Sequence, residues 1–332
     1  MADPRPPAPF RWQDGDRLVV FGRGEAEGAP ALIGEGYTLL TTARALEAAP
    51  AVAAAAGSVH HVPEGRVDDV SAQLREPVQG ETLVALGGGR VIDAAKALAA
   101  ADPPRRVAAI PTTLSGAEMT GLHRHAQGVP AATARVRPAV VINDPALTAS
   151  QPEPALAASA LNAFGHAVEA PLTPLAAPVP TLAAHEAARL IASAFAAREP
   201  DRDALALGAL LAGYAAGAAV YGLHHVMSQT LVRLTGIGHG PANATLLPHT
   251  LRALQRRFPD RLALLEADLG EDAPSVAAAI TARTSTTRLR ERGITAEQLA
   301  ECAEAAASRA ELALTPPAAD RTELLALYEA AW

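Results

Sequence analysis

The sequence is short of three kinds of residue, and each shortage narrows the classes of protein that it can encode. Cysteine occurs once, at Cys302, so no intramolecular disulfide can form and a reducing, cytoplasmic setting is expected. Aromatic residues make up only 3% of the chain, so we expect aliphatic cores rich in alanine and in helix. Lysine also occurs once, at Lys96, and arginine supplies every other permanently charged basic side chain.

Charge and hydropathy argue against two kinds of partner. The net charge of -7 gives no reason to expect nucleic acid or an anionic membrane, and the N-terminus lacks the layout of a signal peptide. Residues 204–223 carry no charge and are long enough to cross a bilayer, but they are rich in Ala and Gly and lead into His224 and His225. We interpret them as a buried helix and expect no nucleic-acid and no membrane partner.

The 332 residues suffice for two domains, and the hydrophobic pattern changes near residue 148. Before that point, short apolar runs alternate with helical stretches, which is typical of a parallel sheet covered on both faces. The predicted strands are 17–21, 37–41, 58–62, 82–86, 107–110 and 140–142, and the helical stretches include 43–56 and 91–101. Beyond that point only helical patterns occur, among them 159–170, 181–197, 203–227, 248–257, 273–292 and 295–313. The sequence thus predicts an α/β, Rossmann-like domain over 1–148 and an all-α domain over 149–332.

A glycine-rich turn links one predicted strand to the helix that follows it. Gly87, Gly88 and Gly89 let the backbone approach a ligand closely, and the N-terminus of the helix favours an anion such as a pyrophosphate. Asp93 and Lys96 follow within that helix. Where lysine is otherwise absent, one beside a phosphate loop suggests a need for a compact ammonium. The alternatives are a purely structural turn and a lysine on a solvated helix face.

These residues resemble the GGGSxxDxxK motif that binds the cofactor pyrophosphate in the iron-containing alcohol dehydrogenases, with Arg90 where that family usually has serine. A second stretch supplies Thr112, Thr113 and Ser115 and resembles the family's PTTxxGSE-type segment, which lines the dinucleotide cleft. The DPALT stretch before residue 149 resembles the segment that closes the family's first domain. The resemblance implies a dehydroquinate synthase-like architecture and NADH or NADPH as cofactor, bound by these residues.

The helical domain contains four residues that resemble the family's DxxxH…H…H metal-binding set. Asn162 and His166 share a helix face at i, i+4 spacing, and His225 and His239 follow later in the chain. In the family this set holds Fe²⁺ or Zn²⁺, which polarises a carbonyl oxygen. Because Asn162 stands in the aspartate position, the site lacks one negative charge, and we expect metal to be weakly bound or absent. A lone histidine on an apolar helix is more often a core residue.

The asparagine also points to one branch of the family. The run around it resembles the NAxxHxVEA sequence of maleylacetate reductases, which reduce a carbon–carbon double bond of an oxo-diacid from aromatic-ring degradation. Gln229 departs from that branch, because its HHxxxH pattern ends in histidine, and the stretch after His239 looks more like the alcohol dehydrogenases. We predict NAD(P)H-dependent hydride transfer to an unsaturated oxo-acid in the interdomain cleft. His225 or His239 would supply a proton or polarise the oxo group, and Asn162 and His166 would shape the pocket.

Cofactor preference is predicted from the end of the second strand. Thr42 and Arg44 lie where an acidic residue would select the 2′-hydroxyl of NADH, so we expect NADPH to be accepted, and the preference between NADPH and NADH stays open. The loop residues His123, Arg124 and His125 either reach substrate carboxylates or form a solvated loop. The family resemblance further implies a small-molecule substrate and a homodimer.

Three other functions stay open. One is a metal-dependent alcohol dehydrogenase or aldehyde reductase of the same superfamily. Another is a lyase related to dehydroquinate synthase, although such enzymes need a glutamate ligand and several lysines for a substrate phosphate. The last is a catalytically silent paralogue that keeps the cofactor cleft, an alternative that Asn162 and Gln229 support.

Overall fold

The computed structural model describes residues 7–332, and the chain divides into two compact units. The first comprises Met1–Gln151 with Arg202–Leu210, and the second comprises Pro152–Asp201 with Leu211–Trp332. The division at Gln151 lies close to the boundary predicted at residue 148. The assignment of Arg202–Leu210 to the first unit was not foreseen.

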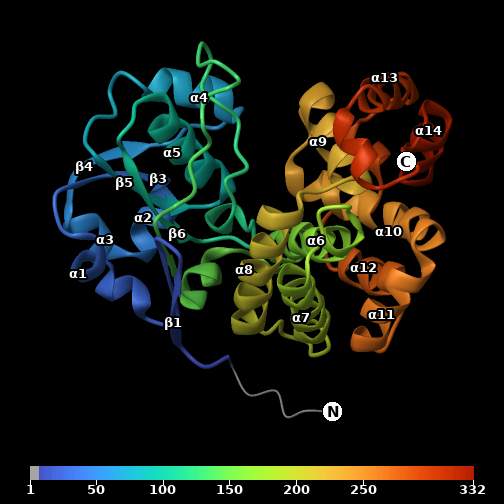
Figure 1. Cartoon of the computed structure of the whole chain (residues 1–332), viewed down its shortest axis with the longest axis horizontal. Coiled ribbons are helices and arrows are strands. Elements are labelled where there is room, and N and C mark those ends of the chain that lie inside the picture. The colour runs from blue at the N-terminus through green and yellow to red at the C-terminus, as the bar shows by residue number, and fades with distance from the viewer. Residues whose placement is uncertain (1–6) are drawn as a thin grey trace. The chain divides into compact units, whose positions relative to one another are not determined.

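The first unit is built on a seven-stranded sheet in the order β1-β2-β7-β6-β5-β3-β4 (Figure 1). Its strands are β1 (Phe10–Asp14), β2 (Arg17–Phe21), β3 (Tyr37–Thr41), β4 (Ala56–His61), β5 (Thr82–Gly87), β6 (Arg106–Pro111) and β7 (Val140–Asn143). All neighbours are parallel except β1, which pairs antiparallel with β2 at the edge. The six predicted strands are confirmed. The sequence analysis missed β1, whose alternate residues are exposed.

Helices cover both faces of this sheet, as the continuous apolar strands predict. They are α1 (Ala29–Ile33), α2 (Ala43–Ala48), α3 (Pro50–Ala54), α4 (Val67–Leu74) and α5 (Gly89–Ala101). Successive residues of one strand point to opposite faces, so Leu40 packs in the core beneath α5, whereas Leu39 packs in the core beneath α2. The single helix predicted over 43–56 is wrong, because the residue before Pro50 disfavours helical geometry and α2 ends there. Helix α4 was not predicted.

The strand order reverses between β3 and β5. From β3 the chain moves outward to β4, then returns past β3 to β5 and continues through β6 to β7. The helices that follow β3 and β5 therefore lie on opposite faces of the sheet. Ligands of open parallel sheets bind at the carboxyl ends of the strands at such a switch point. In this sheet that point lies beside the residues that follow Thr41 and Leu86, which are paired in the register.

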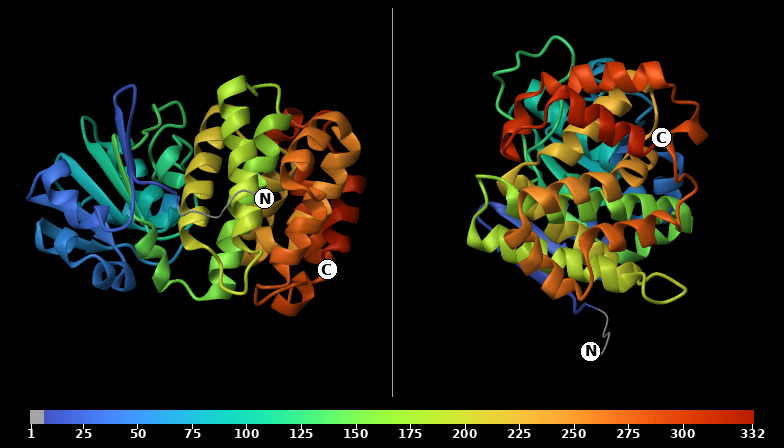
Figure 2. Two further views of the ribbon diagram at one scale, coloured as in Figure 1. Left: turned by 90° about the horizontal axis from the view of Figure 1, so that it is seen from below. Right: turned by 90° about the vertical axis from the view of Figure 1, so that its right-hand side faces the viewer.

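The second unit is helical, and none of its residues, all of which the structure describes, lies in a strand. The all-α prediction is thus confirmed, and Figure 2 shows the helices lying side by side. They are α6 (Glu153–Glu169), α7 (Pro178–Ala194), α8 (Arg202–Ala219), α9 (Leu223–Thr235), α10 (His239–Arg257), α11 (Pro259–Leu269), α12 (Ala273–Thr281), α13 (Ala296–Ala307) and α14 (Arg321–Ala330). Of α8, only the part from Leu211 onward belongs to this unit.

The helix predicted over 203–227 is interrupted. It divides at residues 220–222 into α8 and α9, which are bent by 98°. Val220 has φ 62, a left-handed conformation that is strained for a β-branched residue. Across residues 7–332 no single helix is long and apolar enough for a membrane span, and α8 with α9 meets that criterion only as a bent pair.

Candidate functional site

The glycine turn presents open backbone amides at the carboxyl end of β5. Gly87 ends the strand, Gly88 caps α5 without a side-chain hydrogen bond, and the 13-residue helix begins at Gly89. The first amides of a helix have no partner within the helix. Their partial positive charge suits a pyrophosphate. The residues therefore fit the phosphate end of a dinucleotide.

The second cofactor segment packs directly on this turn. A Cβ added to Gly88 would lie 3.0 Å from Thr113, and one added to Gly89 would lie 3.0 Å from Ser115. The amide of Thr112 donates to the carbonyl of Gly87 at 3.0 Å. A side chain at Gly88 or Gly89 would therefore press against the hydroxyl-bearing loop, which lies directly on the turn. The structure brings together the two segments that the sequence analysis selected.

Lys96 is placed differently from the expectation. It is fully buried, and its Nζ donates to the carbonyl oxygens of Ala117 (2.9 Å), Thr120 (3.2 Å) and Leu122 (3.0 Å). It also forms an ion pair with Asp93 at 2.7 Å. An ammonium has three donor hydrogens, and these oxygens occupy them. Lys96 holds the loop after the second cofactor segment in place, and its ammonium is not left for a phosphate.

The residues predicted to choose the cofactor lie on the other side of the switch point. Thr42 caps α2, since its hydroxyl accepts from the amide of Ala45 at 3.4 Å. Arg44 is exposed in the first turn of the same helix. Because Thr41 pairs with Leu86 in the register, Thr42 follows the strand next to the one that ends in the glycine turn.

The loop histidine His123 is a structural residue. Its Nδ1 donates to the carbonyl of Arg124 at 2.9 Å, and its Nε2 accepts from the amide of Val136 at 3.0 Å. Burial lowers the pKa of His123 to about 4, so it is neutral near pH 7. Arg124 is exposed and lies 3.7 Å from Asp68. These contacts favour the structural interpretation of this loop.

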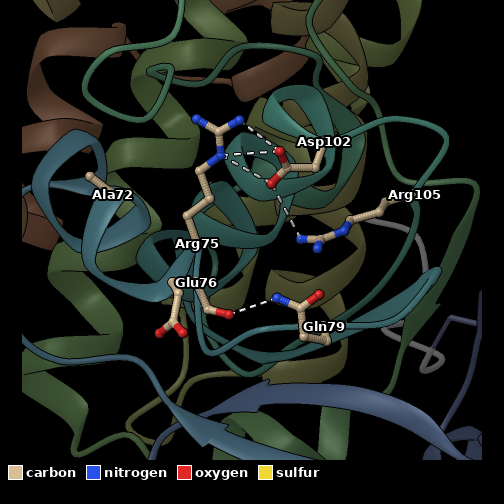
Figure 3. A pocket seen from close by; sticks show the side chains of 6 residues that line it. All are labelled: Ala72, Arg75, Glu76, Gln79, Asp102 and Arg105. Atoms are coloured by element: carbon tan, nitrogen blue, oxygen red, sulfur yellow. Dashed lines mark hydrogen bonds and ion pairs between the residues drawn. The ribbon is translucent and has the colours of Figure 1, made fainter.

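A surface cavity of about 600 Å³ in the first unit lies away from the glycine turn. It is lined by residues that precede β5 and β6, at the amino ends of the strands, and Figure 3 shows Arg75 and Arg105 paired with Asp102. Arg75 binds Asp102 at 2.7 Å, and Arg105 lies 3.7 Å from the same carboxylate. This cavity is therefore not part of the predicted cofactor site.

Two of the predicted histidines meet in the second unit. His166 lies in α6 and His225 near the start of α9, and their rings stack with centroids 3.8 Å apart and an interplanar angle of 12°. Gly165 makes this approach feasible, because a Cβ there would lie 3.0 Å from His224 and 3.3 Å from His225. Because the chain breaks between α8 and α9, His225 lies near the beginning of α9 and not within one long continuous helix.

Glu169 completes this pair, and the sequence analysis missed it. The side chain of Glu169 is fully buried, and its Oε2 is hydrogen-bonded to Nδ1 of His225 at 2.6 Å, with the proton on either atom according to the tautomer of the imidazole. The backbone amides of His224 (2.7 Å) and His225 (3.3 Å) donate to the same carboxylate. The available signal was an acid three residues after His166 on an otherwise apolar helix. Nε2 of His225 is buried and has no hydrogen-bond partner among residues 7–332.

Burial controls the protonation of this group. It lowers the pKa of His225 to about 3, with a further contribution from the charge of His239, and it raises the pKa of Glu169. Burial and the neighbouring His225 also lower the pKa of His166. His224 packs behind the pair with its Nδ1 2.9 Å from the hydroxyl of Thr250, and burial lowers its pKa to about 3. The imidazoles are therefore neutral near pH 7.

Asn162 belongs to an amide network beside the histidines. Its Oδ1 accepts from Nδ2 of Asn243 at 2.9 Å, and Oδ1 of Asn243 accepts from the hydroxyl of Ser228 at 2.5 Å. Asn243 and Ser228 were not among the predicted site residues. His239 is the exposed first residue of α10.

The four predicted ligands do not fit a dication in this arrangement. A metal lies close to the plane of each imidazole that binds it, whereas the nearly parallel planes of His166 and His225 do not meet near the rings. The oxygen of Asn162 is already hydrogen-bonded. Among residues 7–332, no group of three or more His, Cys, Asp or Glu is arranged to hold a metal.

Comparisons with known proteins cover both units. The family model "Iron-containing alcohol dehydrogenase" matches residues 19–145, and "Fe-containing alcohol dehydrogenase family, C-terminal" matches residues 156–332. Maleylacetate reductase of Pseudomonas knackmussii is 32% identical over 287 residues, which cover 83% of this chain and 80% of that protein.

Two further relatives bear the same description. Maleylacetate reductase 2 of Cupriavidus pinatubonensis is 37% identical over 232 residues, 67% of this chain; the match spans 64% of that relative, slightly under two thirds of its length. The crystal structure of maleylacetate reductase from Agrobacterium tumefaciens superposes with a TM-score of 0.82 at 28% identity, covering 97% of both chains.

Proposed function

Because the chain belongs to the iron-containing alcohol dehydrogenase family, we propose that it is an NAD(P)H-dependent reductase of an unsaturated oxo-acid of the maleylacetate type. The observation that carries this proposal is the pair of neutral, stacked histidines backed by Glu169, with an amide instead of a carboxylate at residue 162. The maleylacetate reductases among its relatives support the same substrate class.

The glycine turn and the loop that packs on it would hold the nucleotide in the first unit. The amides that follow Gly88 would hold the pyrophosphate, and the hydroxyls of Thr113 and Ser115 lie beside these amides. Lys96 and Asp93 keep the adjoining loop in position from beneath. Thr42 and Arg44 would accept a 2′-phosphate. When bound, the nicotinamide supplies the hydride that adds to the substrate's double bond.

As the substrate's double bond opens, its electron pair forms the carbon–carbon double bond of an enolate and the carbonyl electron pair moves onto the oxo oxygen. The enolate then takes a proton at the carbon next to the former carbonyl group. An enolate spreads its charge over several atoms, so it needs less local stabilisation than the alkoxide formed from a simple aldehyde. Preorganised hydrogen-bond donors are sufficient for this purpose. Such chemistry is compatible with a site that does not fit a metal.

The contact between Glu169 and His225 decides what Nε2 of His225 can do. With Glu169 ionised, Nδ1 carries the hydrogen and Nε2 accepts; with Glu169 protonated, Nδ1 accepts and Nε2 donates. Burial disfavours the form with a net negative charge, so it favours the donating form. In that form Nε2–H binds the oxo oxygen and can transfer its proton to the enolate, while the Glu169 proton moves to Nδ1.

The test is a steady-state panel of unsaturated oxo-acids and of simple alcohols, each with and without added Zn²⁺ or Fe²⁺. We expect oxo-acid reduction with NADPH and little oxidation of ethanol, propanediol or glycerol. His225→Ala should lower turnover by about 10²–10³-fold, and His239→Ala should lower turnover more than it weakens nucleotide binding. Metal-stimulated alcohol oxidation without oxo-acid reduction would assign the protein to alcohol dehydrogenase chemistry. Nucleotide binding without any turnover would indicate a silent paralogue.

A further inference from the structure

Three polar side chains next to the histidine pair have no part in the chemistry described above. The ring of Tyr221 lies 5.5 Å from that of His225 and 6.5 Å from that of His166. Gln229 follows His225 by one turn of α9, on the same side of the helix. Arg309 follows α13 and reaches Gln229 from a segment 80 residues further along the chain.

One oxygen joins these three side chains. Oε1 of Gln229 accepts from the hydroxyl of Tyr221 at 3.3 Å and from a terminal nitrogen of Arg309 at 3.1 Å. The same edge of the Arg309 guanidinium also binds Glu311, at 2.7 and 3.3 Å. The guanidinium is thus held in one orientation, and its side chain is only 16% exposed. The strained backbone at Val220 directly precedes Tyr221 and fixes the entry into α9.

Donors remain in this group after its internal acceptors are used. Within the described residues, the side-chain nitrogen of Gln229 makes no hydrogen bond to the protein, whereas Arg309 is hydrogen-bonded to Tyr221 as well as to Gln229 and Glu311. All three side chains are partly exposed, so a ligand has access to them. Arg309 carries a permanent positive charge in this part of the unit, and its ion pair with Glu311 at 2.7 Å holds that charge in place.

We propose that Arg309 and Gln229, with Tyr221 beside them, form a subsite for a carboxylate of the substrate. The inference rests on the proposed function and deepens it, since it predicts selection of oxo-diacids over oxo-monoacids. A guanidinium N–H and an amide N–H both donate to carboxylate oxygens, and the charge of arginine strengthens the contact. Gln229 suits this purpose because one amide both fixes Arg309 through its oxygen and keeps its nitrogen donors for the ligand.

The experiment compares two acids of equal chain length that differ by one carboxylate, succinate and butyrate, on the protein loaded with oxidised nucleotide. Calorimetry should show tighter binding of succinate. Arg309→Met should weaken succinate binding by about tenfold to about a hundredfold and leave butyrate binding unchanged. Arg309→Lys should retain part of the preference. The matched control is Arg321→Met. It removes an exposed arginine at the start of α14, which is paired with Glu304 of α13.

Gln229→Met is a second test of the subsite, because it keeps the size of the side chain and the net charge of the site. This variant should also reduce the preference for succinate. The subsite is wrong if wild type binds both acids equally, or if Arg309→Met and Gln229→Met weaken both acids to the same extent. The kinetic counterpart uses an oxo-diacid and its monoester. If wild type reduces no oxo-acid but still prefers succinate, only the proposed function fails. If it reduces the diacid and Arg309→Met keeps the selectivity, only the subsite fails.

Discussion

Glu169 and His225 are joined at 2.6 Å between Oε2 and Nδ1, although 56 residues separate them in the chain. Two backbone amides at the start of α9 donate to the same carboxylate. The helix that begins there is therefore anchored to α6 at the point where His225 enters the site. The contact fixes the orientation of the imidazole and determines which ring nitrogen faces a ligand.

Glu169→Gln should lower turnover by about 10–100-fold, with a smaller effect on nucleotide affinity. The amide nitrogen of glutamine would face one of the two backbone N–H donors. The variant would also lack the carboxyl group that exchanges a proton with Nδ1 of His225. The pH profile of turnover measures the second effect, and ¹⁵N NMR of the imidazole reports its tautomer. Glu186→Gln, at an exposed acid paired with Arg189, is the control. An unchanged turnover and tautomer would show that Glu169 serves only to anchor α9.

Gly88→Ala should raise the KM for the nucleotide by about tenfold or more, since the added Cβ would lie 3.0 Å from Thr113 and displace the cofactor loop. Gly28→Ala is the control, because its Cβ meets nothing within 4 Å and its φ is an ordinary -83. Steady-state kinetics at varied NADPH concentration gives the KM of each variant for the nucleotide. If the two variants have equal KM, the turn does not hold the nucleotide.

Wild type should be purified without tightly bound metal, and chelators should leave its folding unaffected. Asn162→Asp adds a negative charge beside the histidines and keeps an oxygen for the amide of Asn243, so zinc affinity should rise by about tenfold or more. Elemental analysis measures the metal content of the purified protein, and a zinc titration measures the zinc affinity. The surface exchange Gln79→Glu is the control. One firmly held iron or zinc per wild-type chain would contradict the prediction.

NADPH should be accepted, because Thr42 and Arg44 offer no acid to repel a 2′-phosphate. Arg44→Ala should lower kcat/KM for NADPH by about tenfold and leave NADH unaffected, given that a hydrogen bond to a charged group contributes about 1.5–3 kcal/mol. Arg256→Ala removes an exposed arginine of α10 as the control. A preference for NADH above about tenfold that persists in Arg44→Ala would refute this assignment.

Glu118 makes stability dependent on pH. It is 1% exposed, and burial raises its pKa from 4.5 to about 7. Between these values the folded protein retains a proton that the unfolded chain releases, so the stabilisation present below pH 4.5 is lost as pH rises to about 7. Glu118→Gln cannot lose this proton, and at pH 8 it should be more stable than wild type by on the order of 3 kcal/mol. Denaturant unfolding at pH 5 and pH 8 measures this difference, with the exposed exchange Glu76→Gln as the control. If Glu118→Gln changes the free energy of unfolding equally at both pH values, Glu118 is not the titrating group.

The sequence by itself determined the features that depend on local pattern. Apolar runs predicted six of the seven strands, Ala-rich periodicity predicted the helical second unit, and the glycine run predicted the turn at Gly88. The association of that turn with the segment around Thr113 was implied by the family resemblance. Asn162 and His166 were predictable together, since four residues make about one turn of helix. The edge strand β1 was not predicted, because two of its five residues are exposed and none is fully buried.

Only the tertiary structure decided which distant groups meet. The same ammonium that the sequence suggested for a phosphate is enclosed by backbone oxygens, because the loop at 117–122 folds over Lys96. Glu169 reaches His225, and Arg309 reaches Gln229, through packing of helices far apart in the chain. Periodicity specifies the face that a residue occupies on its own element, but partners and protonation depend on burial and on helix contacts, which neighbouring residues in sequence do not encode.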